Sequence, residues 1–288
     1  IVIKADGLAA GKGVFILEDK EKSYKLINDL FTGRIDGVKP AKIIIEEFLK
    51  GEEASFICLV SGDQVLPLAS SKDHKKLNNG DNGPNTGGMG AYSPTKLIDD
   101  KLSNIVIEKI IKPTIKELNR NNIVYHGFLY AGLMIDKNNN PYVLEYNCRL
   151  GDPEAQAILM RLDSDIIEMF QATINSCLDN ISIKWKAESA CTIVLASEGY
   201  PGKYEKNKKI EGLDHDIENI KVFHSGTKLE NGNFLTNGGR VLAVTALGVN
   251  LQVAQAKAYD RCNQISWEGK FKRHDIAEKE INNKFIFS

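Results

Sequence analysis

The sequence lacks the features that mark membrane proteins, secreted proteins and nucleic-acid-binding proteins. Its 288 residues contain no apolar run near the roughly 18 residues that a membrane span needs, and no signal peptide. Lysine and arginine (37) nearly balance aspartate and glutamate (38), so neither a basic surface nor an acidic tail is indicated. We therefore expect a globular protein of the cytoplasm, with no nucleic-acid or membrane partner.

Paired cysteines are also missing. The chain has five cysteines, an odd number, and none stands in the C-x-x-C spacing of zinc sites and redox sites. We expect reduced thiols that pack mostly as small apolar groups. The five are Cys58, Cys148, Cys177, Cys191 and Cys262.

Hydrophobic patterning predicts an α+β chain in which short strands become the main predicted element after about Ala187. The first residues, Ile1 to Lys4, read as a strand without an initiator methionine, which suggests that an upstream segment is missing. Residues 77–93 show no period and are expected to form a long loop. Strands are expected at 1–4, 14–17, 42–48, 53–60, 65–68, 127–135, 142–146, 190–197, 222–225 and 240–247. Helices are expected at 19–31, at 102–110 with an interruption at Pro113, and at 153–161, 165–178 and 250–262.

The most informative segment is L-E-Y-N-C-R-L-G-D-P-E, residues 144–154. Strand side chains alternate between faces, so Glu145, Asn147 and Arg149 should share one side of the strand. A carboxylate and an amide oxygen suit Mg²⁺, and an arginine beside them can balance developing phosphate charge. The alternative is a solvated strand face with a surface ion pair, because E-x-N-x-R is not a rare pattern.

Two further segments have the composition of ligand-binding loops. The acidic strand end I-I-I-E-E-F-L-K-G-E-E, residues 43–53, can offer backbone groups to an adenine and a carboxylate to a ribose, although acidic strand ends are common. The segment G-P-N-T-G-G-M-G, residues 83–90, exposes backbone donors that can surround an anion. A flexible linker is the alternative for this second segment.

The segment K-A-D-G-L-A-A-G-K-G-V, residues 4–14, departs from a P-loop in spacing and lacks the terminal hydroxyl residue. Strand patterns on both sides predict a β-hairpin, so there is no helix N-terminus to hold phosphate. A glycine-rich hairpin loop can instead fold over a nucleotide as a lid, with Lys4 and Lys12 meeting the phosphates.

Taken together and in this order, these motifs resemble the ATP-grasp superfamily. More narrowly, K-D-H-K (72–75), G-P-N-T-G-G-M-G-A-Y-S-P (83–94) and residues 4–14 and 144–154 resemble the phosphoribosylamine–glycine ligase family, over essentially the whole chain. The resemblance implies an ATP-grasp fold, two α+β subdomains that sandwich ATP, followed by a small, mostly β, C-terminal domain. The implied ranges are 1–58, 59–186 and 187–288.

The chemistry implied by the resemblance is ATP-dependent ligation in purine biosynthesis. Glycine is phosphorylated to glycyl phosphate, and the amine of 5-phosphoribosylamine then attacks to give glycinamide ribonucleotide, ADP and phosphate. The implied cofactors are ATP and Mg²⁺, with Mn²⁺ as an alternative ion.

Residue roles follow from the matching motif positions. Glu46 and Leu49 would meet adenine mainly through backbone, and Glu53 would hold the ribose. Nucleotide contacts are implied for Lys4, Lys12, Glu46, Leu49 and Glu53. Magnesium contacts are implied for Glu145 and Asn147, and catalytic roles for Arg149 and Lys12. The substrate cleft would be lined by Asp73, Lys75, Asn85, Thr86, Gly87, Gly88, Met89, Asp152 and Glu154.

The sequence departs from the family pattern in two ways. Many ATP-grasp enzymes carry another metal-binding carboxylate opposite Glu145, where this chain reads Gly132-Leu133-Met134. The family also begins with a nucleotide-fold N-terminal domain that is not in this stretch, and that domain is an expected partner.

Other functions remain open on the sequence alone. The chain could bind nucleotide without catalysis if the upstream domain completes the substrate pocket. A carboxylase-like relative would use bicarbonate in place of glycine. A purely structural role fits poorly with so much loop glycine beside charged strand ends.

Overall fold

The computed structural model describes residues 1–7, 13–35 and 37–285 and divides the chain into two compact units. Unit 1 is Ile1–Lys50 and unit 2 is Gly51–Ser288. Strand β4 (Glu52–Ser61) runs without interruption through position 58, where the sequence analysis set the boundary between the first two ranges. The three ranges expected from the sequence stay predictions.

Unit 1 is a three-stranded antiparallel sheet with one helix against it. The strand order is β2 (Val14–Ile16), β1 (Val2–Ala5), β3 (Ile43–Glu46), and α1 (Lys20–Phe31) packs on one face through a core around Ile3 and Leu30. Asp19 caps this helix, as predicted, by accepting a 2.8 Å hydrogen bond from the Lys22 amide. The predicted hairpin strands are confirmed, whereas Lys12 and the rest of residues 8–12 lie outside the described residues.

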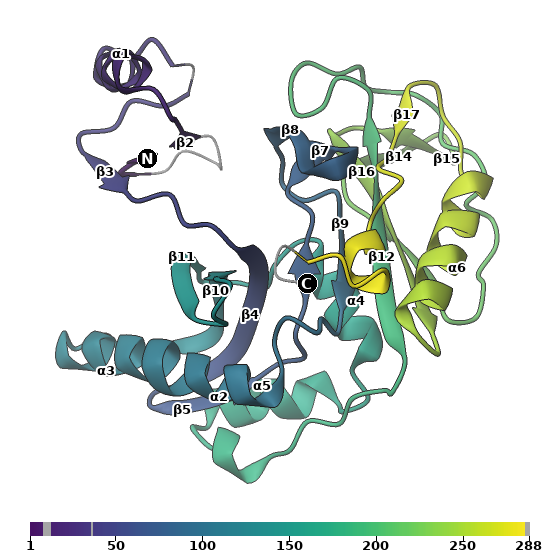
Figure 1. Cartoon of the computed structure of the whole chain (residues 1–288). Coiled ribbons are helices and arrows are strands. Elements are labelled where there is room, and N and C mark those ends of the chain that lie inside the picture. The colour runs from purple at the N-terminus through teal and green to yellow at the C-terminus, as the bar shows by residue number, and fades with distance from the viewer. Residues whose placement is uncertain (8–12, 36, 286–288) are drawn as a thin grey trace. The chain divides into compact units, whose positions relative to one another are not determined.

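The first sheet of unit 2 has the order β11-β10-β4-β5 and carries a different core on each face (Figure 1). Its other strands are β5 (Gln64–Pro67), β10 (His126–Ile135) and β11 (Pro141–Asn147). Ala54, Phe56 and Cys58 pack toward α2 (Asp100–Val106) and α3 (Lys112–Arg120). Ile57 and Leu59 pack toward α4 (Glu154–Arg161) and α5 (Ile166–Ile174), so the alternation of β4 separates the two cores.

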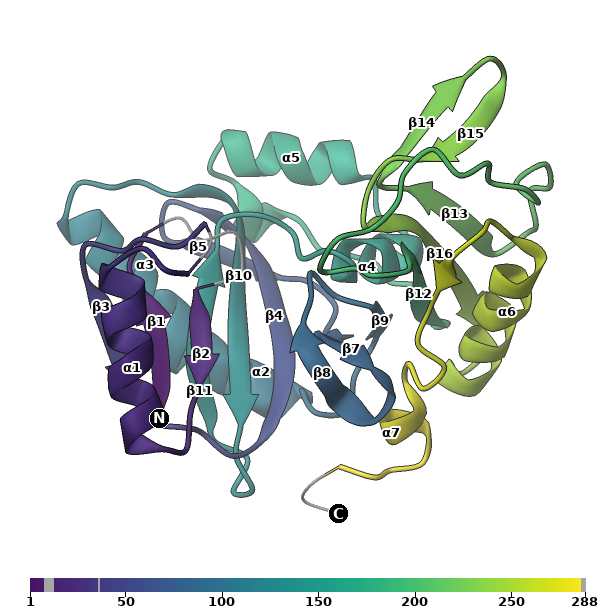
Figure 2. The same cartoon turned by 90° about the horizontal axis from the view of Figure 1, so that it is seen from above.

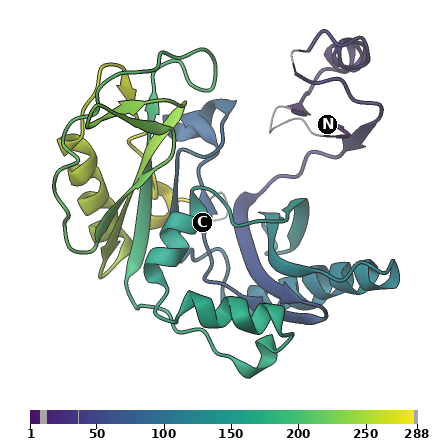
Figure 3. The same ribbon diagram turned by 180° about the vertical axis from the view of Figure 1, so that it is seen from behind.

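The second sheet of unit 2 has the order β13-β16-β12-β9-β6, with β17 paired to β12. Helix α6 (Leu251–Gln264), capped by Asn250 as predicted, packs against β12 and β16, as Figure 3 shows from behind. Strands β6 and β9 come from the part of the chain that precedes residue 187, so the C-terminal sheet is completed by an earlier segment. Its strands are β6 (Lys72–Asp73), β9 (Gly90–Ser93), β12 (Ser189–Ser197), β13 (Ile220–His224), β16 (Arg240–Gly248) and β17 (Lys270–Phe271).

Two expectations from the sequence need correction. Residues 77–93 are not a long loop: they contain β7 (Lys76–Asn78), β8 (Asn82–Asn85) and β9. These strands are rich in polar residues and glycine, and β9 is held by pairing with β12, which no local period reveals. The interruption expected at Pro113 is a π-helical turn, Ile107–Ile111, and Pro113 lies in the first turn of α3, where a missing amide is tolerated.

Residues 270–285, here called the C-terminal strap, pack against the segment that carries β6 to β9 (Figure 2). Glu280 in the short helix α7 (Glu278–Ile281) is 2% exposed. Its carboxylate accepts hydrogen bonds from the Tyr92 hydroxyl (3.0 Å), the Thr95 hydroxyl (2.9 Å) and the Lys96 amide (2.7 Å). The remaining described elements are β14 (Thr227–Glu230), β15 (Asn233–Thr236) and the 3-10 turns Asn79–Asp81 and Leu178–Asn180.

Among the described residues, none of the helices combines the length and the apolar character needed to cross a membrane.

The Glu280 contacts predict a specific stability loss. Glu280→Ala leaves two buried hydroxyls and one partly buried amide without their acceptor, so we expect the free energy of unfolding to fall by about 3 kcal/mol. Glu278 lies two residues earlier in α7 and is exposed, and Glu278→Ala should change the free energy of unfolding by less than about 0.5 kcal/mol. Urea unfolding monitored by circular dichroism measures both, and equal losses in the two variants would contradict the anchoring role of Glu280.

Candidate active site

Strand β11 presents the carboxylate of Glu145 and the amide of Asn147 on one face, as the alternation predicted, and Arg149 lies in the bend just after the strand ends. Asn147 Nδ2 donates to Glu145 Oε1 over 3.4 Å, and an Arg149 nitrogen lies 3.5 Å from Asn147 Oδ1. Tyr146 points the other way, where its hydroxyl lies 2.7 Å from that of Thr114. Glu145 and Arg149 are exposed and Asn147 is half-buried, so the group is accessible to a ligand.

The strand register places Ser55, Gly132 and Glu145 side by side on this face. Gly132 of β10 is opposite Ser55 of β4 and opposite Glu145 of β11. Residues directly opposite each other in antiparallel strands project to the same side of the sheet. Gly132 has no side chain, and a methyl group there would lie 3.2 Å from Glu145 Cγ. Position 132 itself therefore carries no side chain between Ser55 and Glu145, and the Tyr130 ring lies 3.5 Å from where that methyl group would stand.

The donor set on β11 fits Mg²⁺ better than a softer metal. Within the part of the chain that the structure describes, no three His, Cys, Asp or Glu side chains gather closely enough to hold a metal ion. Glu145 and Asn147 supply two hard oxygens, and Mg²⁺ commonly takes one or two protein oxygens and fills its other positions with water and phosphate. Gly132 lies directly opposite Glu145 in the strand register.

Lys75 connects β11 with strand β4. Its ammonium lies 3.0 Å from Glu53 Oε2 and 4.0 Å from Glu145 Oε1. Burial alone would lower the pKa of Lys75, but the carboxylates of Glu53, Asp73 and Glu145 outweigh it and hold the pKa above its usual value. Lys75 is therefore charged. Its charge interacts with Glu53, Glu145 and Asp73, which the sequence analysis assigned to nucleotide, metal and substrate binding respectively.

A small recess opens beside Lys75 on the same face of the sheet. It encloses about 10 Å³, close to the space of one water molecule. Ser55 Oγ donates to Glu154 Oε1 over 2.8 Å and lies 3.1 Å from the Tyr130 hydroxyl. Glu154 is 2% exposed, so its charge is held in this polar network rather than in water. The recess is lined by Glu53, Ala54, Ser55, Asp73, Lys75, Tyr130 and Leu133.

Asp73 contributes a carboxylate oxygen whose bonding capacity is unused. Its Oδ1 is shielded from solvent and has no hydrogen-bond partner among the described residues. Burial raises the pKa of Asp73 well above its ordinary value, and the nearby charge of Glu154 raises it further, while Lys75 acts in the opposite direction. An unpaired buried carboxylate is costly, so this oxygen is a candidate contact for a bound donor.

The glycine-rich loop is held against Asp152 by Arg240 of β16. One guanidinium nitrogen donates to the Gly87 carbonyl (2.5 Å) and the Asp152 carbonyl (3.1 Å), and the other reaches the Asp152 carboxylate at 2.6 Å. The Gly87 amide donates to the Tyr200 hydroxyl over 2.8 Å. Both partners that fix the loop therefore come from the C-terminal part of the chain.

The other predicted cleft residues differ in their surroundings. The Thr86 hydroxyl donates to the Lys75 carbonyl over 2.9 Å and accepts from the Gly88 amide at 3.0 Å, which fixes the loop beside Lys75. Asn85 is exposed at the end of β8. Met89 has a fully buried side chain, and its amide and carbonyl bond to His74 and Val194. Met89 is thus a core residue in this structure.

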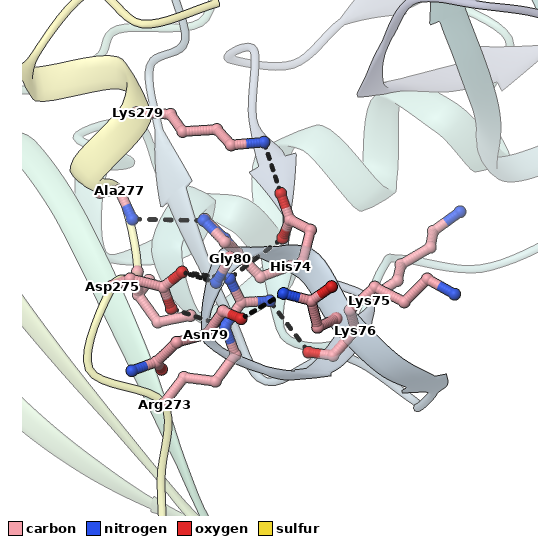
Figure 4. A network of polar contacts seen from close by, with 12 residues as sticks. His74, Lys75, Lys76, Asn79, Gly80, Arg273, Asp275, Ala277 and Lys279 are labelled. Carbon is pink, nitrogen blue, oxygen red and sulfur yellow. Dashed lines mark hydrogen bonds and ion pairs between the residues drawn. The ribbon is translucent and has the colours of Figure 1, made fainter.

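The C-terminal strap fixes the β7–β8 hairpin that follows Lys75 (Figure 4). Arg273 is 1% exposed and donates to the Lys76 carbonyl (2.9 Å) and to the carboxylates of Asp81 (3.0 Å) and Asp275 (2.7 Å). Asp275 also accepts from the Gly80 amide over 2.8 Å. The hairpin is therefore anchored at its base and at its tip by one strap.

The predicted nucleotide residues are divided between the two units. In unit 1, Lys4 Nζ lies 2.7 Å from Glu46 Oε2, and Leu49 is half-buried beyond the end of β3. In unit 2, Glu53 contacts Lys75 as described above. Lys12 lies outside the described residues. The nucleotide roles of these residues stay predictions.

Sequence reasoning missed four residues that shape the site: Ser55, Tyr130, Arg240 and Arg273. Ser55 gave a signal, because it is a polar residue at a buried position within the otherwise apolar stretch 54–60 of β4. The two arginines gave none, since the site segments that they hold, at Asp152 and at Lys76, lie 88 and 197 positions away in sequence.

Two family models match the chain. Residues 1–155 match the phosphoribosylglycinamide synthetase ATP-grasp (A) domain, and residues 190–279 match the C domain of the same synthetase. These matches, together with the solved structure of a relative described in the next paragraph, confirm the α+β ATP-grasp fold followed by a C-terminal domain.

Curated relatives and a solved structure are similar over nearly all of the chain. Phosphoribosylamine–glycine ligase of Vibrio vulnificus is 50% identical over 282 residues, which is 98% of this chain and 66% of the relative. The Salmonella typhimurium ligase is 48% identical over 286 residues, 99% of this chain and 67% of the relative. The crystal structure of the Thermotoga maritima ligase is 36% identical, with a TM-score of 0.87, and the match covers 96% of this chain and 68% of that one. The chain thus spans about two thirds of the length of these proteins.

The position of Gly88 predicts the effect of a single methyl group. Gly88 has φ +106°, and a Cβ would collide with Pro153 and lie 2.8 Å from Asp73 Oδ1. Gly88→Ala should therefore lower the free energy of unfolding by about 3 kcal/mol, from backbone strain plus overpacking. Gly232 also has positive φ (+76°) but open space around it, so Gly232→Ala should cost only about 1 kcal/mol. Urea unfolding compares them, and a smaller loss for Gly88→Ala would contradict the close packing.

Proposed function

The chain belongs to the phosphoribosylglycinamide synthetase family, and on this premise we propose that it carries the catalytic part of a ligase that joins glycine to 5-phosphoribosylamine. ATP phosphorylates the glycine carboxylate, and the substrate amine attacks the carbonyl carbon of glycyl phosphate. The bond from that carbon to the phosphate oxygen breaks, which releases phosphate and leaves the amide of glycinamide ribonucleotide. The reaction belongs to de novo purine biosynthesis.

The observation that supports this proposal best is the grouping of Glu145, Asn147 and Lys75 on one sheet face. Mg²⁺ held by Glu145 and Asn147 would neutralise phosphate charge at that face. Arg149, exposed beside them, has the fork geometry to stabilise the phosphoryl group during transfer. Lys75 lies between this group and the recess, where its positive charge can orient an anionic substrate group.

The remaining roles are proposed by residue. Lys4 and Lys12 contact phosphates, Glu46 and Leu49 meet adenine through backbone, and Glu53 holds the ribose. The loop of residues 85–89, with Asp152, serves the substrate side, where Arg240 fixes its shape.

The reaction itself gives the first test. In the full-length protein that carries this chain, ADP release measured by a coupled assay should require both glycine and 5-phosphoribosylamine. Turnover with bicarbonate in place of glycine would instead indicate a carboxylase-like activity. Binding of Mg-ATP in a calorimeter without any turnover would favour a nucleotide-binding module instead.

The proposed metal contact gives a second test. Glu145→Gln keeps the size of the side chain but removes its charge, so kcat should fall at least about 100-fold, because a metal contact is worth several kcal/mol in the transition state. Glu218 is exposed in the C-terminal part of the chain, and Glu218→Gln should leave kcat within about twofold. Raising the Mg²⁺ concentration should restore part of the Glu145→Gln rate. An unchanged rate in this variant would exclude Glu145 as a ligand.

A further inference from the structure

The C-terminal strap holds both residues that flank Lys75 in the chain. Arg273 donates from one guanidinium nitrogen to the Lys76 carbonyl over 2.9 Å, and the Ala277 amide donates to Nε2 of His74 over 3.3 Å. Figure 4 shows the Lys75 side chain extending away from this cluster. The strap therefore fixes the backbone on either side of Lys75 rather than its ammonium group.

Arg273 is itself fixed by two carboxylates. It is 1% exposed and donates to both oxygens of Asp275, at 2.8 Å and 2.7 Å, and to Asp81 at 3.0 Å. Asp81 also accepts from Lys279 Nζ over 2.6 Å. The two carboxylates compensate a guanidinium charge that burial would otherwise make costly. The planar fork binds Asp275 through two nitrogens while the third reaches the Lys76 carbonyl, which a single ammonium cannot do.

His74 provides the second contact between the strap and this segment. The imidazole is 6% exposed, and burial, followed by the positive charge of Arg273, lowers the pKa of His74 to about 3. The ring is therefore neutral at neutral pH, and Nε2 keeps the lone pair that accepts the Ala277 amide. The residue immediately before Lys75 thus stays bonded to the strap throughout the pH range of enzyme assays.

The Lys75 side chain has a placement that depends closely on its backbone. Its ammonium lies 3.0 Å from Glu53 Oε2 on β4 and 4.0 Å from Glu145 Oε1 on β11, and Lys75 belongs to a segment outside that sheet. A shift of about 1 Å would carry the Glu53 contact beyond the range of an effective hydrogen bond. The Thr86 amide and hydroxyl also hold the Lys75 carbonyl. The strap and the Thr86 loop together therefore determine where the ammonium lies.

From this arrangement we propose that Arg273 is a positioning residue for the ligase reaction. By holding the Lys76 carbonyl, Arg273 keeps the Lys75 ammonium between Glu53 and Glu145, beside the face where the metal ion is proposed to bind. This inference rests on the proposed function for what Lys75 does, and on the contacts above for what places it. A requirement of catalysis then lies in the C-terminal strap, 197 positions from the residue that it holds.

The placement of Lys75 can be measured without substrate. Trace labelling of the full-length protein with acetic anhydride at about pH 8, followed by mass spectrometry, acylates only neutral amines, and the surrounding carboxylates hold the pKa of Lys75 above its ordinary value. Arg273→Ala should free the ammonium from these carboxylates. Labelling of Lys75 relative to exposed Lys22 should therefore rise about 10-fold, the effect of a pKa lower by about one unit.

The matched control is Arg161→Ala. Arg161 is also buried, at 8% exposed, and donates to the carbonyls of Glu188 (2.7 Å) and Lys186 (3.3 Å) and to the Ser93 hydroxyl (2.9 Å). Both variants lose buried hydrogen bonds, so both should unfold at a lower temperature than the wild type. Arg161→Ala should nevertheless leave the labelling of Lys75 unchanged, whereas a loss of stability alone would change it equally in the two variants.

Steady-state kinetics test the catalytic consequence. Arg273→Ala should lower kcat about 10- to 100-fold, because a displacement of about 1 Å at a site can cost on the order of 100-fold. Arg161→Ala should keep kcat within about threefold. Arg273→Lys should lose nearly as much as Arg273→Ala, since an ammonium cannot form the fork. Guanidinium at low millimolar concentration should restore part of kcat, and lower Lys75 labelling, in Arg273→Ala but not in Arg273→Lys, where a side chain still fills the site.

Asp275→Asn carries the same test if Arg273→Ala does not fold. It keeps the size of the side chain but removes the charge that binds the guanidinium, so Lys75 labelling should rise about threefold, the effect of about half a pKa unit. Unchanged Lys75 labelling in whichever of the two variants folds, or a kcat there no lower than that of Arg161→Ala, would overturn the inference. Absence of ligase turnover in the wild type would instead overturn the proposed function.

Discussion

The site depends on one half-buried electrostatic contact, the ammonium of Lys75 among the carboxylates of Glu53, Asp73 and Glu145. Without that charge, three acidic side chains from three different strands would repel one another at a surface that is only partly exposed to water. Lys75 is itself placed by the Thr86 loop on one side and by the strap-anchored β7–β8 hairpin on the other. Residues far apart in the sequence therefore act together to set one side chain.

The open face of the first sheet follows from strand alternation. One end of that face is apolar and packs on α4 and α5, whereas the other end carries Ser55, Gly132 and Glu145. Because packing at the apolar end fixes the strand register, the side chains at the polar end take defined positions. Such support from a rigid sheet is what a site for phosphoryl transfer requires, since catalysis there is mainly positioning and charge stabilisation.

Much of the fold could be predicted because its signals are local. The alternation of β4, β10 and β11 and the caps at Asp19 and Asn250 depend on residues a few positions apart. The grouping of Glu145, Asn147 and Arg149 is local for the same reason. The strands within residues 77–93 were missed, because β9 is held by β12, a partner about 100 positions further along the chain. The Asp73 recess and the Arg240 and Arg273 clamps likewise exist only after distant segments pack together.

The central claim is that the sheet face at β11 holds a metal ion through Glu145 and Asn147. The most direct test is anomalous diffraction from a crystal of the full-length protein grown with Mn²⁺, a non-hydrolysable ATP analogue and glycine. The account predicts an anomalous peak bonded to oxygens of both Glu145 and Asn147. A peak away from β11 would contradict it.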